Sequence, residues 1–467
     1  MSAPQVYTRV DRTVIPAPRP APHLVLPPLQ KATLSNGLPL WLVEQHRNPQ
    51  VVLGIVLRGG SFFDPPGRSG TASLTAELLE SGTASRDALA ISEAVEFLGS
   101  TLVFRSGADG TFGTLLTLSR HLEAGVGLFA DVLVHPAVPR GEFERLRAQR
   151  LASLVQMKDR AAAVATNAFM RVVYGDRHPY GKDPAGTGES VRTLTRDDVL
   201  RFYGEHYAPG AATLIAVGDT TMAEIVPLLE KEIGAWKGGS APAPSAAPPE
   251  PASPAGVYLI DRPGAPQSEI RIGRPALPRD TPDYFPVTLM NRVLGGQFSS
   301  RINLNLREKR GYTYGARSSF IFMKHPGPFM VSGAFTRSKT GEAAQQLFLE
   351  IDAMHREGIT RGELEFSRKG LNGAFALSFE TPFQVAAAVQ NIVVYGLPED
   401  YYERYTGEIE AVTTEDVRRA AGSTLDTSAM ALIVVADARA VRDDLASIGR
   451  GPVVELDSEG GMLTQGS

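Results

Sequence analysis

Two polar side chains near residue 75 have the spacing of a metal site. Ser73 and Glu77 are four residues apart, so a helix would place both on one face, one turn from each other. A peptidase zinc ion needs three protein ligands, and a nearby carboxylate must accept a proton from the metal-bound water. A serine hydroxyl is a poor zinc ligand, which leaves Glu77 as one good oxygen ligand. None of the eight histidines lies three or four residues from another, which excludes an ordinary helical pair of histidine ligands.

Residues 70–83 resemble the zinc-binding helix of the M16 metallopeptidase family, which includes pitrilysin, insulinase and mitochondrial-processing-peptidase-like proteins. That helix reads approximately G-x-A-H-x-x-E-H and is followed by G-T. The resemblance places the first histidine at Ser73, the catalytic glutamate at Ala76 and the second histidine at Glu77. In isolation, an Ala/Leu-rich helix of this kind is usually a packing helix.

A later segment, residues 143–154, resembles the family helix that carries the third zinc ligand, a glutamate. The position of that ligand falls on Ser153. The resemblance therefore implies a non-catalytic M16 chain that lacks the HxxEH motif. We expect no intrinsic catalytic residue, no metal site and no cofactor in this chain.

Residues 294–314 resemble the most recognisable C-terminal motif of the same family. In that motif an arginine and a tyrosine seven positions apart bind the substrate backbone and help to polarise the scissile carbonyl, and they match Arg307 and Tyr314. A guanidinium and a phenol can both donate hydrogen bonds to a peptide carbonyl. Arg301 and Gly295-Gly296 are expected to shape the same wall. The alternative is a purely structural motif, with Arg307 in an exposed ion pair and Tyr314 half-buried in a strand.

The two halves of the chain match each other at a nearly constant offset, which indicates an internal duplication. Residues 40–43 match 257–260, 140–143 match 361–364, 194–199 match 412–417, and 215–219 match 433–437. Within each half, strand-like runs precede an Ala/Leu-rich helix, then a hairpin, long helices and a closing strand. This order predicts an α+β organisation with antiparallel sheets covered by helices.

The M16 resemblance implies the LuxS and processing-peptidase type of metallohydrolase fold. Two homologous halves, each of two ferredoxin-like α+β units, would form a clamshell around a cavity. We expect a Pro-rich arm at residues 1–30, an N-terminal domain with the degenerate zinc site at 31–236, and a Pro/Ala/Ser linker at 237–255. A C-terminal domain with the Arg/Tyr motif follows at 256–467.

The charge and composition of the chain exclude several further classes of function. A net charge of −4 with a pI near 6.1 gives no reason to expect nucleic-acid binding. The absence of cysteine excludes disulfides, thiol catalysis and cysteine-ligated metals. We expect no membrane span. The first thirty residues lack the apolar run of a signal peptide, which favours a cytoplasmic protein, or a periplasmic one if an upstream signal is missing.

His178 and His206 have no partner at ligand spacing and are interpreted as packing residues.

Some M16 members are two-chain assemblies in which one chain carries the zinc helix and the other completes the cavity. The leading hypothesis is therefore a heterodimer with a zinc-bearing M16 subunit, in which Arg307 and Tyr314 bind the peptide substrate. The alternative is a scaffold that holds peptides or proteins in the clamshell without cleavage. An independent serine hydrolase is disfavoured, because Ser73 has no histidine base within helical reach.

Overall fold

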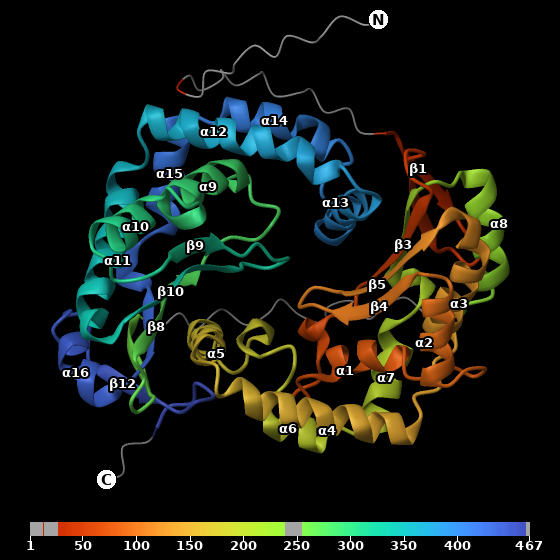
Figure 1. Ribbon diagram of the computed structural model, residues 1–467, viewed down its shortest axis with the longest axis horizontal. Coiled ribbons are helices and arrows are strands. Elements are labelled where there is room, and N and C mark those ends of the chain that lie inside the picture. The colour runs from red at the N-terminus through yellow and green to blue at the C-terminus, as the bar shows by residue number, and fades with distance from the viewer. Residues whose placement is uncertain (1–12, 14–26, 239–254, 464–467) are drawn as a thin grey trace, which may run out of the picture.

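The computed structural model describes residue 13 and the ranges 27–238 and 255–463. The predicted Pro-rich arm and the predicted linker therefore lie almost entirely outside the described residues. Two six-stranded sheets, one from each half of the chain, form the framework (Figure 1). No helix within the described ranges is both long and apolar enough to cross a membrane.

The two sheets have the same strand arrangement. The first has the order β1-β2-β6-β3-β5-β4 and the second β12-β7-β11-β8-β10-β9. The strands of the first sheet are β1 (Leu29–Thr33), β2 (Pro39–Glu44), β3 (Gln50–Leu57), β4 (Thr101–Ser106), β5 (Thr111–Leu118) and β6 (Ala212–Gly218). Those of the second are β7 (Gly256–Asp261), β8 (Gln267–Pro275), β9 (Ala316–Phe320), β10 (Pro328–Thr336), β11 (Ala431–Ala436) and β12 (Val453–Leu456). The predicted hairpins correspond to β4–β5 and β9–β10.

The sheets are mixed rather than purely antiparallel. Strand β2 pairs in parallel with β6, and β7 pairs in parallel with both β11 and β12. The remaining neighbours are antiparallel. A closing strand that returns to the sheet after a series of helices can enter in either direction, and parallel pairing requires such a long connection.

The helices repeat in the same order in both halves. The first half contains α1 (Thr71–Leu79), α2 (Ala88–Phe97), α3 (Leu122–Val134), α4 (Arg140–Met157), α5 (Ala161–Tyr174), α6 (Gly188–Thr193), α7 (Arg196–His206) and α8 (Met222–Ile233). The second contains α9 (Tyr284–Asn291), α10 (Arg301–Asn303), α11 (Thr340–Glu357), α12 (Arg361–Phe375), α13 (Pro382–Tyr395), α14 (Tyr401–Ala411), α15 (Thr414–Thr424) and α16 (Ala438–Ala446). The repeated segments fall on equivalent elements: β2 and β7, α4 and α12, α7 and α15, β6 and β11.

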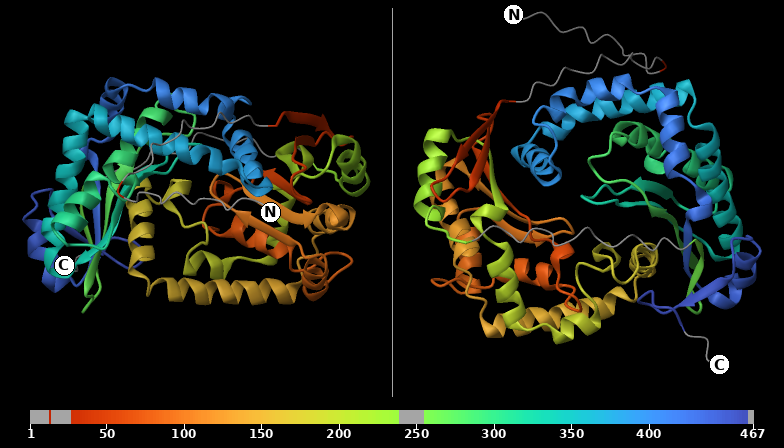
Figure 2. Two further views of the ribbon diagram at one scale, coloured as in Figure 1. Left: turned by 45° about the horizontal axis from the view of Figure 1, so that its top comes forward. Right: turned by 180° about the vertical axis from the view of Figure 1, so that it is seen from behind.

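One helix of each half packs on the sheet of the other half. Helix α5 packs on β8 and β11, and α13 packs on β3 and β6 (Figures 1 and 2). Phe169 of α5 is fully buried in one cluster with Ile433, and Val389 of α13 is buried in another with Val217. Because both faces of the central strands are covered, β6 and β11 are almost continuously apolar. Each half therefore keeps its own large core, and two smaller hydrophobic clusters are shared between the halves.

The tip of the β9–β10 hairpin closes a second contact between the halves. The Lys324 amide donates to Asp109 Oδ2 at 2.9 Å, and the His325 amide donates to the Tyr180 hydroxyl at 3.2 Å. The Tyr174 hydroxyl donates to the Pro326 carbonyl at 2.8 Å. Asp109 itself lies at the tip of the β4–β5 hairpin. Equivalent hairpins of the two halves are thus involved in holding the molecule together.

Candidate functional site

Helix α1 carries the degenerate zinc positions, and a buried carboxylate fixes its start. Asp64 Oδ2 accepts from the Gly70 amide at 2.8 Å, and Oδ1 accepts from the Ala72 amide at 2.7 Å. Burial raises the pKa of Asp64 to about 7, against the lowering effect of these two N–H groups. Gly70 has φ 97°, and a Cβ there would lie 2.9 Å from the Ala185 carbonyl oxygen. The entry to α1 is therefore tightly constrained.

An arginine occupies the space between the first two degenerate positions. Arg150 of α4 donates from Nη1 to Ser73 Oγ at 2.7 Å and from Nη2 to Glu77 Oε1 at 2.6 Å. Its Nη1 also donates to the Ala185 carbonyl at 3.0 Å. The Arg150 side chain is only 10% exposed, whereas Glu77 is 42% exposed. A fixed positive charge therefore lies where the resemblance would place a metal cation.

These residues do not fit zinc. A guanidinium is always protonated and has no lone pair to offer, and it occupies the one carboxylate of the cluster. Ala76 is fully buried and apolar. Across the described ranges, no three histidine or acidic side chains converge as a metal-binding group would require. No catalytic step can be derived through a metal at this position.

The structure places Arg150, one helical turn before Ser153, against Ser73 and Glu77. Ser153 is exposed on α4. Sequence reasoning missed the role of Arg150 because arginine is not a metal ligand. One feature of the sequence could have indicated this role. Arg150 lies three residues before the predicted third ligand, and therefore close to the same face of the helix.

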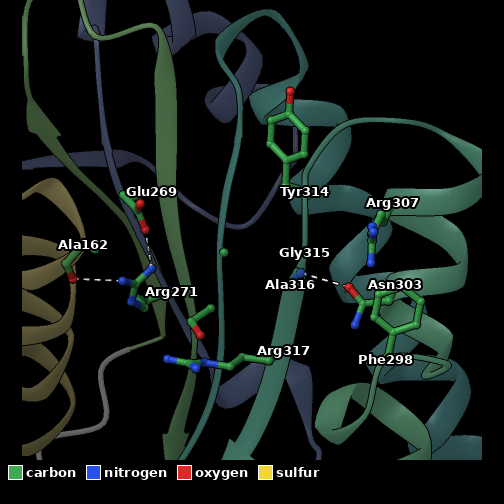
Figure 3. Close-up of a pocket in the computed structure, with 12 residues that line it drawn as sticks. Ala162, Glu269, Arg271, Phe298, Asn303, Arg307, Tyr314, Gly315, Ala316 and Arg317 are labelled. Carbon is green, nitrogen blue, oxygen red and sulfur yellow. Dashed lines mark hydrogen bonds and ion pairs between the residues drawn. The ribbon is translucent and has the colours of Figure 1, made fainter.

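Arg307 and Tyr314 line one pocket of about 390 Å³ (Figure 3). Arg307 belongs to the π-helical turn Leu304–Lys309 that continues α10, and its Cζ lies 4.2 Å from the centre of the Phe298 ring. Glu308 Oε1 lies 3.5 Å from Arg307 Nε. Tyr314 is 93% exposed, and its hydroxyl has no hydrogen-bond partner among the described residues. None of Ser73, Ala76, Glu77 and Ser153 lines this pocket.

Side-chain hydrogen bonds of Thr313 and Asn303, rather than the tyrosine itself, hold the loop that carries Tyr314. Thr313 Oγ1 donates towards the carbonyls of Gly315 and Ala334, at 2.9 and 2.6 Å. The Ala316 amide donates to Asn303 Oδ1 at 3.1 Å, which ties the start of β9 to α10. The structural alternative predicted a half-buried strand residue at 314. Instead, the side chain extends from a fixed loop before β9.

The opposite side of the pocket comes from β8 and α5. Arg271 is 5% exposed and pairs with Glu269 at 2.9 Å. It also donates to the Ala162 carbonyl at 2.8 Å and to Thr166 Oγ1 at 3.1 Å, across the contact between the halves. The N–H donors of Arg271 are therefore engaged in structural contacts. Sequence reasoning did not single out this wall, because its residues meet only when α5 packs on the sheet of the other half.

Arg301 has a different role from the predicted one. It does not line the pocket, and its guanidinium forms two hydrogen bonds of 2.7 Å with the carboxylate of Glu363. A third bond of 3.1 Å joins it to the Gly358 carbonyl. Arg301 therefore ties α10 to the start of α12. Gly295 packs against Ser318 of β9, where a Cβ would come within 2.4 Å of the Ser318 amide nitrogen.

The two histidines interpreted as packing residues are buried. His178 is 2% exposed, and its Nδ1 accepts from the Tyr180 amide at 3.0 Å. Its ring lies 4.9 Å from Tyr174 and 5.1 Å from Tyr180. Burial lowers the pKa of His178 to about 4. His206 is 4% exposed and packs on Phe202, with ring centres 4.3 Å apart.

We expect the buried His178 to make the protein less stable in mild acid. The unfolded chain binds a proton near pH 6.5, whereas the folded state keeps the ring neutral down to about pH 4. Stability is therefore lost as the pH falls through this window, by at most about 3 kcal/mol. His178→Asn retains an acceptor and cannot titrate. Urea unfolding at pH 7.5 and 4.5 should show a smaller loss for the variant, and an equal loss in both proteins would contradict this explanation.

Family models match most of the described chain. Residues 40–179 match the model described as Insulinase (Peptidase family M16), and residues 193–371 match the model described as Peptidase M16 inactive domain. The chain belongs to the M16 peptidase family. The resemblance places the zinc-binding and catalytic residues of that family at Ser73, Ala76 and Glu77 of this chain.

Relatives of both kinds are found. An uncharacterized zinc protease of Streptomyces coelicolor is 25% identical over 404 residues, which cover 85% of this chain and 87% of that protein. The non-peptidase homolog YmxG of Helicobacter pylori is 21% identical and covers 81% and 87%, respectively. The names of relatives therefore differ on activity, and the residues of each chain must decide it.

Solved structures agree with the fold. The peptidase M16 inactive domain from Pseudomonas fluorescens superimposes with a TM-score of 0.82 at 27% identity, covering 88% of this chain and 98% of that one. A protease from Helicobacter pylori gives the same TM-score at 20% identity, with 88% and 100% covered. The α+β fold and its two homologous halves are thereby confirmed. Together with the degenerate helix α1, these matches support a catalytically inactive M16-like protein.

Proposed function

We propose that this chain is the non-catalytic subunit of a two-chain M16 peptidase. It pairs with a zinc-bearing M16 subunit and supplies Arg307 and Tyr314 to the peptide-binding side of the cavity. The observation that carries this proposal is that Arg307 and Tyr314 share a pocket and have few structural partners. The pairing of Arg150 with Glu77, where the resemblance would place a metal, agrees with it.

The chemistry of the pocket suits a peptide backbone. The Arg307 guanidinium has five N–H donors in a plane, and Tyr314 adds a hydroxyl donor on a loop that Thr313 holds in place. Phe298 stacks under Arg307 and restricts its orientation. Donors held in place before the substrate arrives can stabilise negative charge that develops on a carbonyl oxygen. The zinc-bound water and the general base would come from the partner.

Co-expression with a zinc-bearing M16 chain encoded in the same genome tests the assembly. We expect the two chains to co-purify as a 1:1 complex by light scattering, with about one zinc per complex that the partner holds. Separate chromatography of both chains with no complex at micromolar concentration would contradict the proposal. A complex that forms without any gain in peptidase activity would instead support the peptide- or protein-binding scaffold.

A further inference from the structure

A second pocket, of about 620 Å³, lies in the C-terminal half and shares no residue with the Arg307 pocket. Aromatic rings dominate its lining, and it contains one cationic side chain and no carboxylate. The rings are those of Tyr284, Phe322, Phe375, Phe379, Tyr395, Tyr401, Tyr402 and Tyr405, and the cation is Arg279. Its volume is within the range of small-molecule sites.

Arg279 is buried without a counter-ion. It is 8% exposed, and no carboxylate of the described residues lies within salt-bridge distance of its guanidinium. The Cζ atom lies 3.7 Å from the centre of the Tyr284 ring, and Nη2 donates to the Tyr401 hydroxyl at 2.7 Å. No acceptor within the described part of the chain bonds to Nε or Nη1. Neither atom is among the fully buried side-chain polar atoms without a partner, so both keep some contact with solvent, where a ligand could replace water.

Arg271 is a buried arginine with a structural role, and its contacts show how this chain balances a buried positive charge. Arg271 and Arg279 are the only buried arginines among the described residues. Arg271 pairs with Glu269 and donates to three further oxygen atoms. Arg279 has one neutral acceptor and two aromatic faces. The difference indicates that the remaining donors of Arg279 serve an anion that is not part of the described chain.

The aromatic side chains that line the pocket indicate the chemistry of the remaining part of the ligand. Phe375 and Tyr405 are stacked with centres 4.4 Å apart, and Tyr284 and Phe322 lie 4.8 Å apart. Each ring of these pairs uses one face on its neighbour, so a ligand ring would contact an opposite face or an edge. Exposed residues of α13, among them Ala387 and Asn391, border the pocket, so a ligand can enter from solvent.

We propose that this pocket binds an aromatic carboxylate, with the ring among the tyrosines and phenylalanines and the carboxylate on Arg279. Arg–carboxylate pairs are charge-assisted and directional. The ligand is either a free aromatic acid or the C-terminal residue of a peptide, since both present the same two groups. The inference does not depend on the proposed peptidase partnership.

Calorimetry with matched probes on the full chain tests the proposal. We expect N-acetyl-phenylalanine or 3-phenylpropanoate to bind with a Kd below about 1 mM, and N-acetyl-phenylalanine amide to bind at least about 10-fold more weakly. Tighter binding of the first acid would identify a peptide C-terminus, and tighter binding of the second a free aromatic acid. Equal binding of the acid and the amide, or no binding of either acid, would overturn the proposal.

Two variants locate the site. Arg279→Met removes the charge and should weaken binding of the carboxylate probe by about 10-fold or more while leaving the amide unchanged. Ala387→Trp fills the mouth from the exposed face of α13 and should abolish binding even if Arg279→Met fails to fold. Ala374→Trp, at an exposed position of α12 outside the pocket, is the matched control and should bind as the parent chain does. Undiminished binding in Ala387→Trp would refute this location.

Discussion

A variant with Ser73→His, Glu77→His and Ser153→Glu is expected to bind zinc poorly as long as Arg150 remains. The same triple variant with Arg150→Leu is expected to bind about one zinc ion per chain. In the parent chain the Arg150 guanidinium lies 2.7 Å from Ser73 Oγ and 2.6 Å from Glu77 Oε1. Its charge would therefore be within about 4 Å of any metal held there, a repulsion of several kcal/mol at an effective dielectric constant of about 20.

The measurement is zinc content after dialysis, followed by competition with a chelator to give the affinity. We expect the Arg150→Leu background to raise the affinity by about 100-fold or more. Ala76 stays unchanged in both variants, because the general base is not a ligand and the position is fully buried. Arg150→Leu alone serves as the folding control. Stoichiometric zinc in the triple variant that retains Arg150 would show that the guanidinium does not exclude the metal.

The second large effect concerns the proposed complex. Arg307→Ala should lower kcat/KM of the reconstituted peptidase by about 100-fold or more, because a preorganised donor to the reacting carbonyl is lost. Tyr314→Phe removes only a hydroxyl and should reduce activity in the same direction. Neither change should alter the mass of the complex, since Tyr314 is 93% exposed and the Arg307 guanidinium pairs with Glu308 and stacks on Phe298, both residues of its own segment.

Neighbouring residues provide matched controls for this prediction. Arg310 is exposed, bonds to Asn305 Oδ1 and does not line the pocket, so Arg310→Ala tests the loss of a positive charge from the same turn. Tyr312→Phe removes a hydroxyl that donates to Glu342 outside the pocket. Both controls should retain parental activity in the complex. An Arg307→Ala complex as active as these controls would remove the catalytic part of the proposed function.

Local sequence patterns were sufficient to predict the hairpins, the closing strands and the duplication. The Thr195/Asp198 and Thr413/Asp416 capping boxes begin equivalent helices in the two halves, and the hairpins and closing strands are where alternation predicted them. Such features depend on neighbours within a few residues, so a single sequence records them. The family resemblance, rather than spacing alone, identified Arg307 and Tyr314, which line one pocket.

Features that depend on contacts across the molecule could not be predicted in this way. The exchange of α5 and α13 between the halves has no local signature, because each helix is simply amphipathic or apolar in sequence. The same applies to Arg150, because it contacts Ser73 and Glu77 only when α4 packs against α1. Arg301 was placed in the pocket by its neighbours in sequence, but Glu363, 62 residues away, holds it elsewhere.

Peptide turnover by the two purified M16 chains, alone and mixed, tests the central claim most directly. A quenched fluorescent peptide should be cleaved slowly by the zinc-bearing chain and not by this chain. We predict that an equimolar mixture will raise the rate by about 100-fold, the effect expected when one set of preorganised donors completes a site. A mixture no faster than the zinc-bearing chain alone would contradict the account.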